Sequence, residues 1–421
     1  MTPAKTSFPK DKIRIVLAEG VHEAGAQRLI AAGFDVVTLA GALTGDALAQ
    51  AAAEAHVLGI RSKTQIDEGT LDGAGRLLAV GCFCAGTNQV DLEGAAARGV
   101  PVFNAPFSNT RSVAEMTISE VIALHRRMFD RSGKMHAGVW DKSSAGSHEV
   151  RGKTLGIVGY GHIGSQVSVL AEAMGMVVVY YDVEAKLPLG NARACGSLGE
   201  LLERADVVTL HVPATPTTKG MIGAREIGRM KPGAMLINNA RGSVVDVDAL
   251  AAAVKTGRLG GAAVDVFPEE PARAGESFTS PLQGLSNVIL TPHVGGSTIE
   301  AQAAISEEVA GKLIRFINEG TTLGAVNVPQ VDLPDQGEAA RGVLPEDRRP
   351  HRILHFHRNV PGVLSKLHAV ISSLGANVTG EHLRTTSEIG YVVLDVDPTD
   401  AAPLLEGIRK IPETIRTRVL W

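Results

Sequence analysis

Three side chains that could together oxidise an alcohol follow short apolar runs in the second half of the sequence. Arg241 follows LINNA, Glu270 lies in DVFPEEP, and His293 follows ILTP. Histidine titrates near neutral pH and can accept a hydroxyl proton. A carboxylate beside it can hold its tautomer and raise its pKa, and arginine offers a permanently charged fork for a substrate carboxylate. Singly, each residue is more often a surface or core residue, but their joint placement after predicted strands indicates a catalytic site.

A glycine-rich turn indicates where a dinucleotide would bind. The run TLGIV at 154–158 leads directly into GYGHIG at 159–164, and a helical pattern follows. The glycines allow a tight turn, and the unpaired N–H groups of the helix N-terminus can face the pyrophosphate. Asp182 ends the next predicted strand and would accept hydrogen bonds from the adenosine ribose, which favours NAD over NADP. The alternative is a glycine-rich turn in an unrelated α/β fold.

Alternating strand and helix patterns predict the elements that must position these residues. Such alternation is typical of parallel strands joined by helical crossovers. We expect strands over 13–17, 36–39, 57–60, 77–80 and 100–103, and over 155–158, 177–181, 207–212, 235–238, 262–266 and 288–290. The last six runs predict a complete doubly wound dinucleotide fold. Long helices are expected over 112–135 and 298–318.

The C-terminal part of the sequence has a different pattern. Residues 329–350 are rich in proline, glycine and charge, which predicts a linker. Beyond it, strands near 352–357, 377–383, 391–396 and 414–420 and helices over 361–374 and 400–411 give the order βαββαβ. That order is typical of a ferredoxin-like module, which we expect to be able to sit apart from the catalytic body.

Composition limits the possible partners. The 421 residues suffice for two or three domains, and the net charge of −4 without a basic tract disfavours nucleic acid and anionic membranes as partners. The three cysteines cannot build a disulfide framework and lack metal-ligand spacing. With a polar N-terminal stretch that lacks the apolar core of a secretory signal, they predict a cytoplasmic protein without a metal site.

Three motifs resemble the D-isomer-specific 2-hydroxyacid dehydrogenase family: RGSVVD at 241–246, DVFPEEP at 265–271 and TPHVGGST at 291–298. The resemblance implies that Arg241 binds the substrate carboxylate and that His293 is the proton donor and acceptor, with Glu270 as its partner. It also implies that Asp265 lies near the nicotinamide carboxamide. The full set of implied NAD-binding residues is Gly159, Gly161, His162, Ile163, Gly164, Asp182, Asn239, Ala240, Arg241, Asp265, His293, Gly295 and Gly296.

The same resemblance implies an α/β architecture of three domains. An NAD-binding Rossmann domain (109–296) is inserted in a flavodoxin-like α/β substrate-binding domain (1–108 and 297–330), and the active site is expected in the cleft between them. A linker (331–350) then leads to a C-terminal ferredoxin-like βαββαβ ACT domain (351–421).

The segments GCFCAGTNQVD at 81–91 and NAPFSNTRSVAE at 104–115, with the C-terminal module, resemble one bacterial branch of this family. That branch oxidises D-3-phosphoglycerate to 3-phosphohydroxypyruvate in the first step of L-serine biosynthesis. The resemblance implies a homotetramer that L-serine inhibits by binding at His357, Asn359 and Asn377. For the substrate we expect Arg61, Ser62 and Asn109 to assist Arg241.

Other interpretations remain open from the sequence. The enzyme could be a related dehydrogenase that reduces 2-oxoglutarate or another 2-keto acid. A dinucleotide-sensing regulator with an amino-acid-binding tail would bind NADH and serine without turnover, although the complete Arg–Glu–His set argues against it. The C-terminal module could also serve only to assemble subunits.

Overall fold

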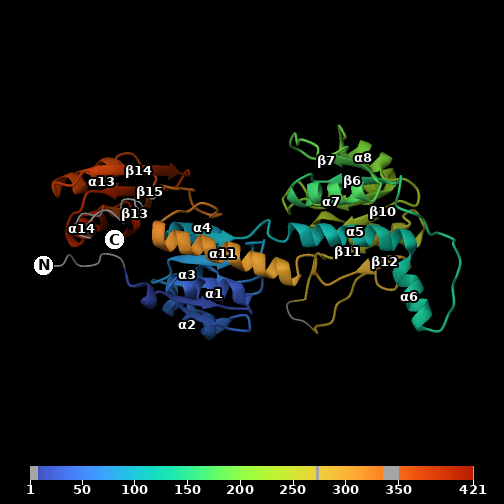
Figure 1. Ribbon diagram of the computed structural model, residues 1–421, viewed down its shortest axis with the longest axis horizontal. Helices are drawn as coiled ribbons and strands as arrows, with labels where there is room; N and C mark the ends of the chain where they lie inside the picture. The colour runs from blue at the N-terminus through green and yellow to red at the C-terminus, as the bar shows by residue number, and fades with distance from the viewer. Residues whose placement is uncertain (1–7, 272–274, 335–349, 421) are drawn as a thin grey trace. The chain divides into compact units, whose positions relative to one another are not determined.

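The computed structural model describes residues 8–271, 275–334 and 350–420 (Figure 1). Its contacts divide the chain into a first unit, residues 1–108 with 302–421, and a second unit, residues 109–301. The first boundary lies between Ser108 and Asn109. The second falls at 301/302 rather than 296/297, just inside helix α11 (Ile299–Glu319), which returns the chain to the first unit.

The first unit contains a five-stranded parallel sheet in the order β2-β1-β3-β4-β5, which is the flavodoxin-like order. Its strands are β1 (Arg14–Leu17), β2 (Asp35–Thr38), β3 (Val57–Ile60), β4 (Ala79–Cys82) and β5 (Val102–Asn104). The connecting helices are α1 (Glu23–Ala31), α2 (Gly45–Glu54), α3 (Glu68–Gly73) and α4 (Leu92–Ala97), and the short helix η1 (Lys10–Lys12) precedes β1. We call this sheet and its helices, with residues 302–334, the first domain.

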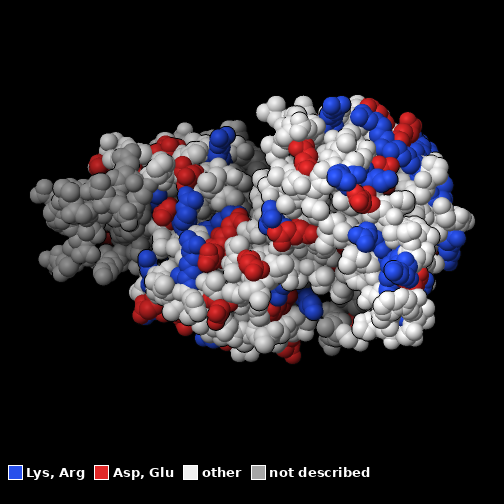
Figure 2. All heavy atoms as spheres, turned by 45° about the vertical axis from the view of Figure 1, so that its right-hand side comes forward, with Lys and Arg blue, Asp and Glu red and all other residues white. Residues whose placement is uncertain are grey.

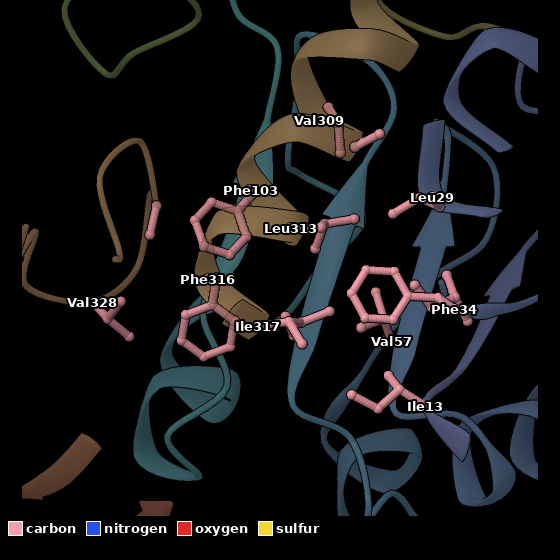
Figure 3. Packing of buried hydrophobic residues seen from close by; sticks show 14 of the residues in the cluster. Ile13, Leu29, Phe34, Val57, Phe103, Val309, Leu313, Phe316, Ile317 and Val328 are labelled. Carbon is pink, nitrogen blue, oxygen red and sulfur yellow. The ribbon is translucent and has the colours of Figure 1, made fainter. Parts of the chain in front are cut away.

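Helix α11 completes the core of the first domain. Val309, Leu313, Phe316 and Ile317 recur at helical spacing and pack on the sheet, as Figure 3 shows. The ring centroids of Phe316 and Phe103 are 5.8 Å apart. Because these buried side chains come from a segment some two hundred residues beyond the strands they cover, the first domain is discontinuous in sequence.

The second unit contains a seven-stranded parallel sheet in the order β12-β11-β10-β9-β6-β7-β8. Its strands are β6 (Thr154–Val158), β7 (Val177–Tyr181), β8 (Arg193–Ala194), β9 (Val207–Leu210), β10 (Met235–Asn238), β11 (Gly261–Val264) and β12 (Val288–Leu290). Counted within the unit this is 3-2-1-4-5-6 with a seventh strand added, the Rossmann order. The sequence predicted six strands and missed β8, because two exposed residues carry no apolar pattern.

The helices of the second unit differ from expectation at one point. They are α5 (Thr110–Arg126), α6 (Met128–His136), α7 (His162–Ala173), α8 (Leu198–Arg204), α9 (Ala224–Arg229) and α10 (Val247–Lys255), with the short helix η2 (Gly242–Val244). The prediction of one helix over 112–135 is wrong, because Arg127 adopts a left-handed conformation (φ 51°) that separates α5 from α6. Its guanidinium donates to Ser286 Oγ at 2.7 Å, a partner that a local pattern cannot reveal.

The C-terminal domain, residues 350–420, has the predicted βαββαβ order. Its elements are β13 (His351–Arg358), α13 (Val363–Ser373), β14 (Val378–Thr385), β15 (Ile389–Val396), α14 (Ala401–Arg409) and β16 (Thr414–Leu420). The antiparallel sheet has the order β14-β15-β13-β16, and one of its faces packs against α13 and α14. The α/β fold class predicted from the sequence, with its two parallel sheets and this antiparallel module, is confirmed.

The opposite face of the C-terminal sheet packs against the first domain, within the first unit. Leu354, Phe356 and Tyr391 join the same core as α11, and Tyr391 Oη donates to the carbonyl of Gly320 at 2.5 Å. The described contacts therefore hold this module to the first domain, whereas the sequence pattern had suggested one that could sit apart. Of the predicted linker, residues 335–349 lie outside the described residues, while Val331 is buried in the first domain.

The molecular surface carries both signs of charge. On the face that Figure 2 draws, lysine and arginine side chains are interspersed with aspartate and glutamate. Within residues 8–271, 275–334 and 350–420, no helix is long and apolar enough to cross a lipid bilayer.

Candidate active site

The structure joins His293 and Glu270 directly, in the second unit. They lie beyond the carboxyl ends of β12 and β11, and His293 Nδ1 is 2.8 Å from Glu270 Oε2. The other oxygen of Glu270 accepts a hydrogen bond from the Phe267 N–H at 3.1 Å, which fixes the carboxylate. Since a carboxylate can only accept, Nδ1 carries the hydrogen and Nε2 is left to exchange a proton with a substrate.

The electrostatics of this pair suit acid–base chemistry. The hydrogen bond to Glu270 raises the pKa of His293, against the opposing effect of burial. Burial acts to raise the pKa of Glu270, but the hydrogen bonds from His293 and the Phe267 N–H outweigh it and lower the pKa. The charge of Arg241, which follows β10, contributes to both values, lowering the Glu270 pKa and opposing the rise at His293.

Asp265 organises the loop that carries His293. Its carboxylate is 1% exposed and accepts hydrogen bonds from Thr291 Oγ1 (2.6 Å), Val294 N–H (2.8 Å) and Gly295 N–H (2.8 Å). His293 itself has φ 54°, a left-handed conformation uncommon for residues other than glycine. The resemblance implied that Asp265 lies near the nicotinamide. Its carboxylate is engaged by the loop that carries His293, and its direct contact with the cofactor stays a prediction.

The glycine-rich turn has the geometry that a dinucleotide site needs. Gly159 has φ 92°, and a Cβ there would come within 2.5 Å of the carbonyl oxygen of His211. A Cβ on Gly164 would collide with the carbonyl of Gly159, so the start of α7 lies tight against the turn. Gly161 caps α7, and His162 and Ile163 are its first residues. The first N–H groups of α7 therefore lie at the glycine turn, where the pyrophosphate of a dinucleotide would bind.

Asp182 lies beside the same turn, one residue beyond the end of β7. Its Oδ2 accepts a hydrogen bond from the Tyr160 N–H at 2.8 Å, and its Oδ1 accepts one from the Glu184 N–H at 3.0 Å. The carboxylate is thus fixed at the end of the strand next to the glycine turn. A dinucleotide site is expected to have, at this position, a carboxylate that binds the adenosine ribose. These residues fit NAD.

The segment before Arg241 is tied to helix α5. Asn239 is 8% exposed, and its Nδ2 donates to Glu120 Oε2 at 2.7 Å and to Thr117 Oγ1 at 3.1 Å. The N–H of Ala240 donates to Asn238 Oδ1 at 3.2 Å. The Asn239 amide is thereby directed at the helix, so its role at the cofactor stays a prediction. No feature of the sequence pointed to Glu120, which lies in an ordinary helical pattern.

Glu120 is an unusual group for this position. It is 4% exposed, and burial raises its pKa to about 7, with the Asn239 hydrogen bond opposing and the charge of Asp265 adding to the rise.

Gly296, at the end of the His293 loop, packs directly against the amide of Asn109, the residue that precedes α5. Asn109, a predicted substrate residue, therefore lies next to the loop that carries His293.

The other predicted substrate residues, Arg61 and Ser62, lie in the first unit, directly after β3. Glu19, which follows β1, organises their loop: its carboxylate accepts hydrogen bonds from the N–H groups of Arg61 (3.2 Å), Lys63 (3.0 Å) and Thr64 (2.8 Å). Sequence reasoning missed Glu19, although an acidic residue just after a strand and before a glycine could have drawn notice. The substrate role of Arg61 and Ser62 stays a prediction.

Two of the three predicted effector residues share a cavity. A space of about 190 Å³ in the C-terminal domain is lined by His357, Asn359 and the first turn of α13, among others. Asn377 does not line this cavity; its backbone N–H donates to Asp397 Oδ2 at 3.2 Å at the start of β14.

Known proteins with similar sequences decide the family. Residues 118–295 match the NAD-binding domain of the D-isomer specific 2-hydroxyacid dehydrogenases. The chain is 52% identical over 418 residues to D-3-phosphoglycerate dehydrogenase of Haemophilus influenzae, with 99% of each chain covered. It is 50% identical over 421 residues to the enzyme of that name from Escherichia coli, with 99% of this chain and 100% of the relative covered.

The chain belongs to the D-isomer-specific 2-hydroxyacid dehydrogenase family. Its second unit is therefore the NAD-binding domain of such a dehydrogenase, and the predicted NAD cofactor is confirmed.

Solved structures with a similar fold agree with the assignment. The TT0316 protein of Thermus thermophilus is 34% identical, with a TM-score of 0.65, 71% of this chain and 95% of that chain covered. D-lactate dehydrogenase of Aquifex aeolicus, solved with NAD and lactic acid, is 27% identical, with a TM-score of 0.63. The match covers 72% of this chain and 95% of that chain. Residues 353–416 match an ACT domain like that of the acetohydroxyacid synthase (AHAS) small subunit, which confirms the ACT assignment of the C-terminal domain.

Proposed function

We propose that the protein oxidises D-3-phosphoglycerate to 3-phosphohydroxypyruvate with NAD, the first step of L-serine biosynthesis. The observation that carries the proposal is the 2.8 Å contact between His293 Nδ1 and Glu270 Oε2 in a chain that carries the NAD-binding turn. The choice of substrate is supported by full-length relatives at 50–52% identity that bear the name of this dehydrogenase.

The residues divide the reaction among them. Arg241 binds the substrate carboxylate and polarises the carbonyl that forms at C2. His293 accepts the C2 hydroxyl proton at Nε2, while Glu270 stabilises the imidazolium through Nδ1. NAD, when bound, supplies the acceptor for the hydride that leaves C2. The proton and the hydride together account for the two hydrogens lost from the alcohol, and the reverse reaction returns both.

Turnover of 3-phosphoglycerate by purified protein with NAD tests this proposal. We expect His293→Ala to lose about 10²–10⁴-fold in kcat and still to bind NADH, as measured by its fluorescence. His136→Ala is the matched control, because His136 is exposed at the end of α6 in the same unit. Near-normal turnover in His293→Ala would show that another group moves the proton.

A substrate panel separates the proposal from its alternatives. Consumption of NADH with 2-oxoglutarate, faster than with 3-phosphohydroxypyruvate, would favour a related 2-keto acid reductase. Binding of NADH without turnover of any 2-hydroxy acid would favour a dinucleotide-sensing regulator. Arg241→Lys keeps the charge but loses the two-pronged geometry, so we expect it to raise KM for 3-phosphoglycerate.

We further propose that L-serine inhibits the enzyme through the C-terminal domain. The cavity there opens onto the first turn of α13, whose N–H groups can bind a carboxylate, and Val363, Leu364 and Ser365 line it with His357 and Asn359. His357 Nε2 is buried and has no hydrogen-bond partner among the described residues, so a polar ligand could satisfy it.

Serine titrations of turnover test the regulatory proposal. We expect millimolar serine to inhibit the intact enzyme, and His357→Ala or Asn359→Ala to weaken inhibition while leaving the uninhibited rate unchanged. His368→Ala, exposed on α13 and paired with Glu381 outside the cavity lining, is the matched control. An intact enzyme that ignores serine would contradict this part alone.

A cytoplasmic homotetramer completes the proposal. The free thiols of Cys82, Cys84 and Cys195 support a reducing compartment. Light scattering of the purified protein and fractionation of cells test these two points.

A further inference from the structure

A basic cavity lies where the ACT domain packs against the first domain. Its volume is about 520 Å³, and it is lined by Lys12, His56 and Arg76 of the first domain and by Arg416 and Arg418 of β16, among others. None of the described lining residues is an aspartate or glutamate. The cavity belongs to neither the NAD turn nor the cavity proposed for serine.

The two arginines of β16 are held without any carboxylate partner among the described residues. Arg416 donates to the carbonyl of Leu77, and Arg418 Nη2 donates to the carbonyl of Ile317 at 3.0 Å. Nη1 of Arg418 is buried and has no hydrogen-bond partner within the described chain. Burial lowers the pKa of Arg418 to about 10; Tyr391 opposes this shift, and the neighbouring charge of Arg416 adds to it.

The rim of the cavity adds more positive charge. Lys12 and Arg76 are exposed, and neither makes an ion pair within residues 8–271, 275–334 and 350–420. His56 accepts a hydrogen bond from the Arg14 N–H at Nδ1, so its Nε2 carries the hydrogen and can donate. Burial lowers the pKa of His56, and the charges of Arg76 and Arg418 lower it further.

On the same face of the ACT sheet, a different buried arginine has an acidic partner. Arg352 is fully buried, and its guanidinium binds both oxygens of Asp395 at 2.7 and 2.8 Å. Where β16 meets the first domain, the described chain supplies four basic side chains and a histidine but no such acid. Like charges at close range cost free energy, and desolvated guanidinium groups bind multivalent oxyanions strongly.

We propose that this cavity binds a phosphate group, either as inorganic phosphate or as part of a phosphorylated small molecule. The bound oxyanion touches both domains, because Lys12 and Arg76 belong to the first domain and Arg416 and Arg418 to the ACT domain. Occupation of the site therefore strengthens the contact between the ACT domain and the first domain. The site is independent of the proposed reaction and of the serine cavity.

Calorimetric titration of the full chain with inorganic phosphate at low salt tests the site. The double variant Lys12→Gln, Arg76→Gln removes two exposed charges without touching the core, and we expect its phosphate affinity to fall by about tenfold or more. Arg409→Gln is the matched control, because Arg409 is exposed on α14 of the ACT domain, outside the cavity lining. Turnover without phosphate should be unchanged in both.

The Arg241→Gln variant separates this site from the catalytic one. We expect it to retain phosphate binding, because Arg241 lies in the second unit. Equal affinity in the wild type and the double variant, loss of binding in Arg241→Gln alone, or no binding at tens of millimolar phosphate would each overturn the proposal. A parallel titration with glycerol phosphate identifies the source: tighter binding that depends on Lys12 and Arg76 supports a phosphorylated metabolite, and weaker binding supports inorganic phosphate.

Discussion

Replacing Asp265 by asparagine tests whether this carboxylate positions the catalytic loop. One oxygen accepts two hydrogen bonds, from Thr291 Oγ1 and Val294 N–H, and the other accepts one from Gly295 N–H. An amide keeps a single accepting oxygen. If its NH₂ takes the place of Oδ1 it faces two donors, so the less costly orientation puts it against the N–H of Gly295.

The expected cost follows from that orientation. One hydrogen bond to a charged group is lost and the N–H of Gly295, a buried residue, is left without its acceptor, which together cost about 2 kcal/mol or more in the free energy of unfolding. Because the same loop carries His293, a displacement of about 1 Å there would lower kcat by roughly 10²-fold. We therefore expect Asp265→Asn to lose both stability and turnover.

Urea unfolding and steady-state kinetics, with the NAD concentration varied up to saturation, measure the two effects. Asp246→Asn is the matched control: Asp246 caps α10 through the N–H of Ala249, and asparagine caps helices about as well as aspartate. If Asp265→Asn raised KM for NAD while stability and kcat stayed at wild-type values, Asp265 would act as a direct cofactor ligand, and the positioning argument would be refuted.

Three further predictions concern buried or paired charges. Glu270→Gln removes the partner that raises the pKa of His293 above its ordinary 6.5. Because oxidation needs the unprotonated imidazole, the acid limb of the kcat/KM profile should move to lower pH, and its plateau should fall about tenfold. An acid limb that did not move would contradict the pairing. The Glu120 pKa, about 7 when folded against an ordinary 4.5, implies that stability falls by about 3 kcal/mol as pH rises from 4.5 through 7. In Glu120→Gln the urea midpoint should lose this dependence, whereas an unchanged slope would rule the carboxyl out. Arg352→Leu leaves Asp395 buried without its main partner and should lower the free energy of unfolding in urea by about 3–5 kcal/mol. The double variant Arg352→Leu, Asp395→Leu should recover part of that loss. A single variant as stable as the wild type would show that the pair is not important for stability.

Much of the catalytic unit could be predicted from the sequence because its signals are local. A strand, a glycine turn and a helix are adjacent in the chain, so the tight turn at Gly159 and Gly164 and the position of Asp182 after the next strand could be predicted from the local sequence. The family resemblance implied the pairing of His293 with Glu270, and the structure joins the two side chains beyond the carboxyl ends of neighbouring parallel strands. The βαββαβ order of the ACT domain was read from periodicity in the same way.

Tertiary structure decided what depends on partners distant in the sequence. Asp265 holds residues 291–295, Glu19 holds the loop of Arg61, and Glu120 binds Asn239 across more than a hundred positions. The break at Arg127 and the docking of the ACT sheet on the first domain likewise depend on remote groups, Ser286 and Gly320. A hydrogen bond between remote residues leaves no periodic trace in either segment, so only the folded chain reveals which polar side chain is buried and what it binds.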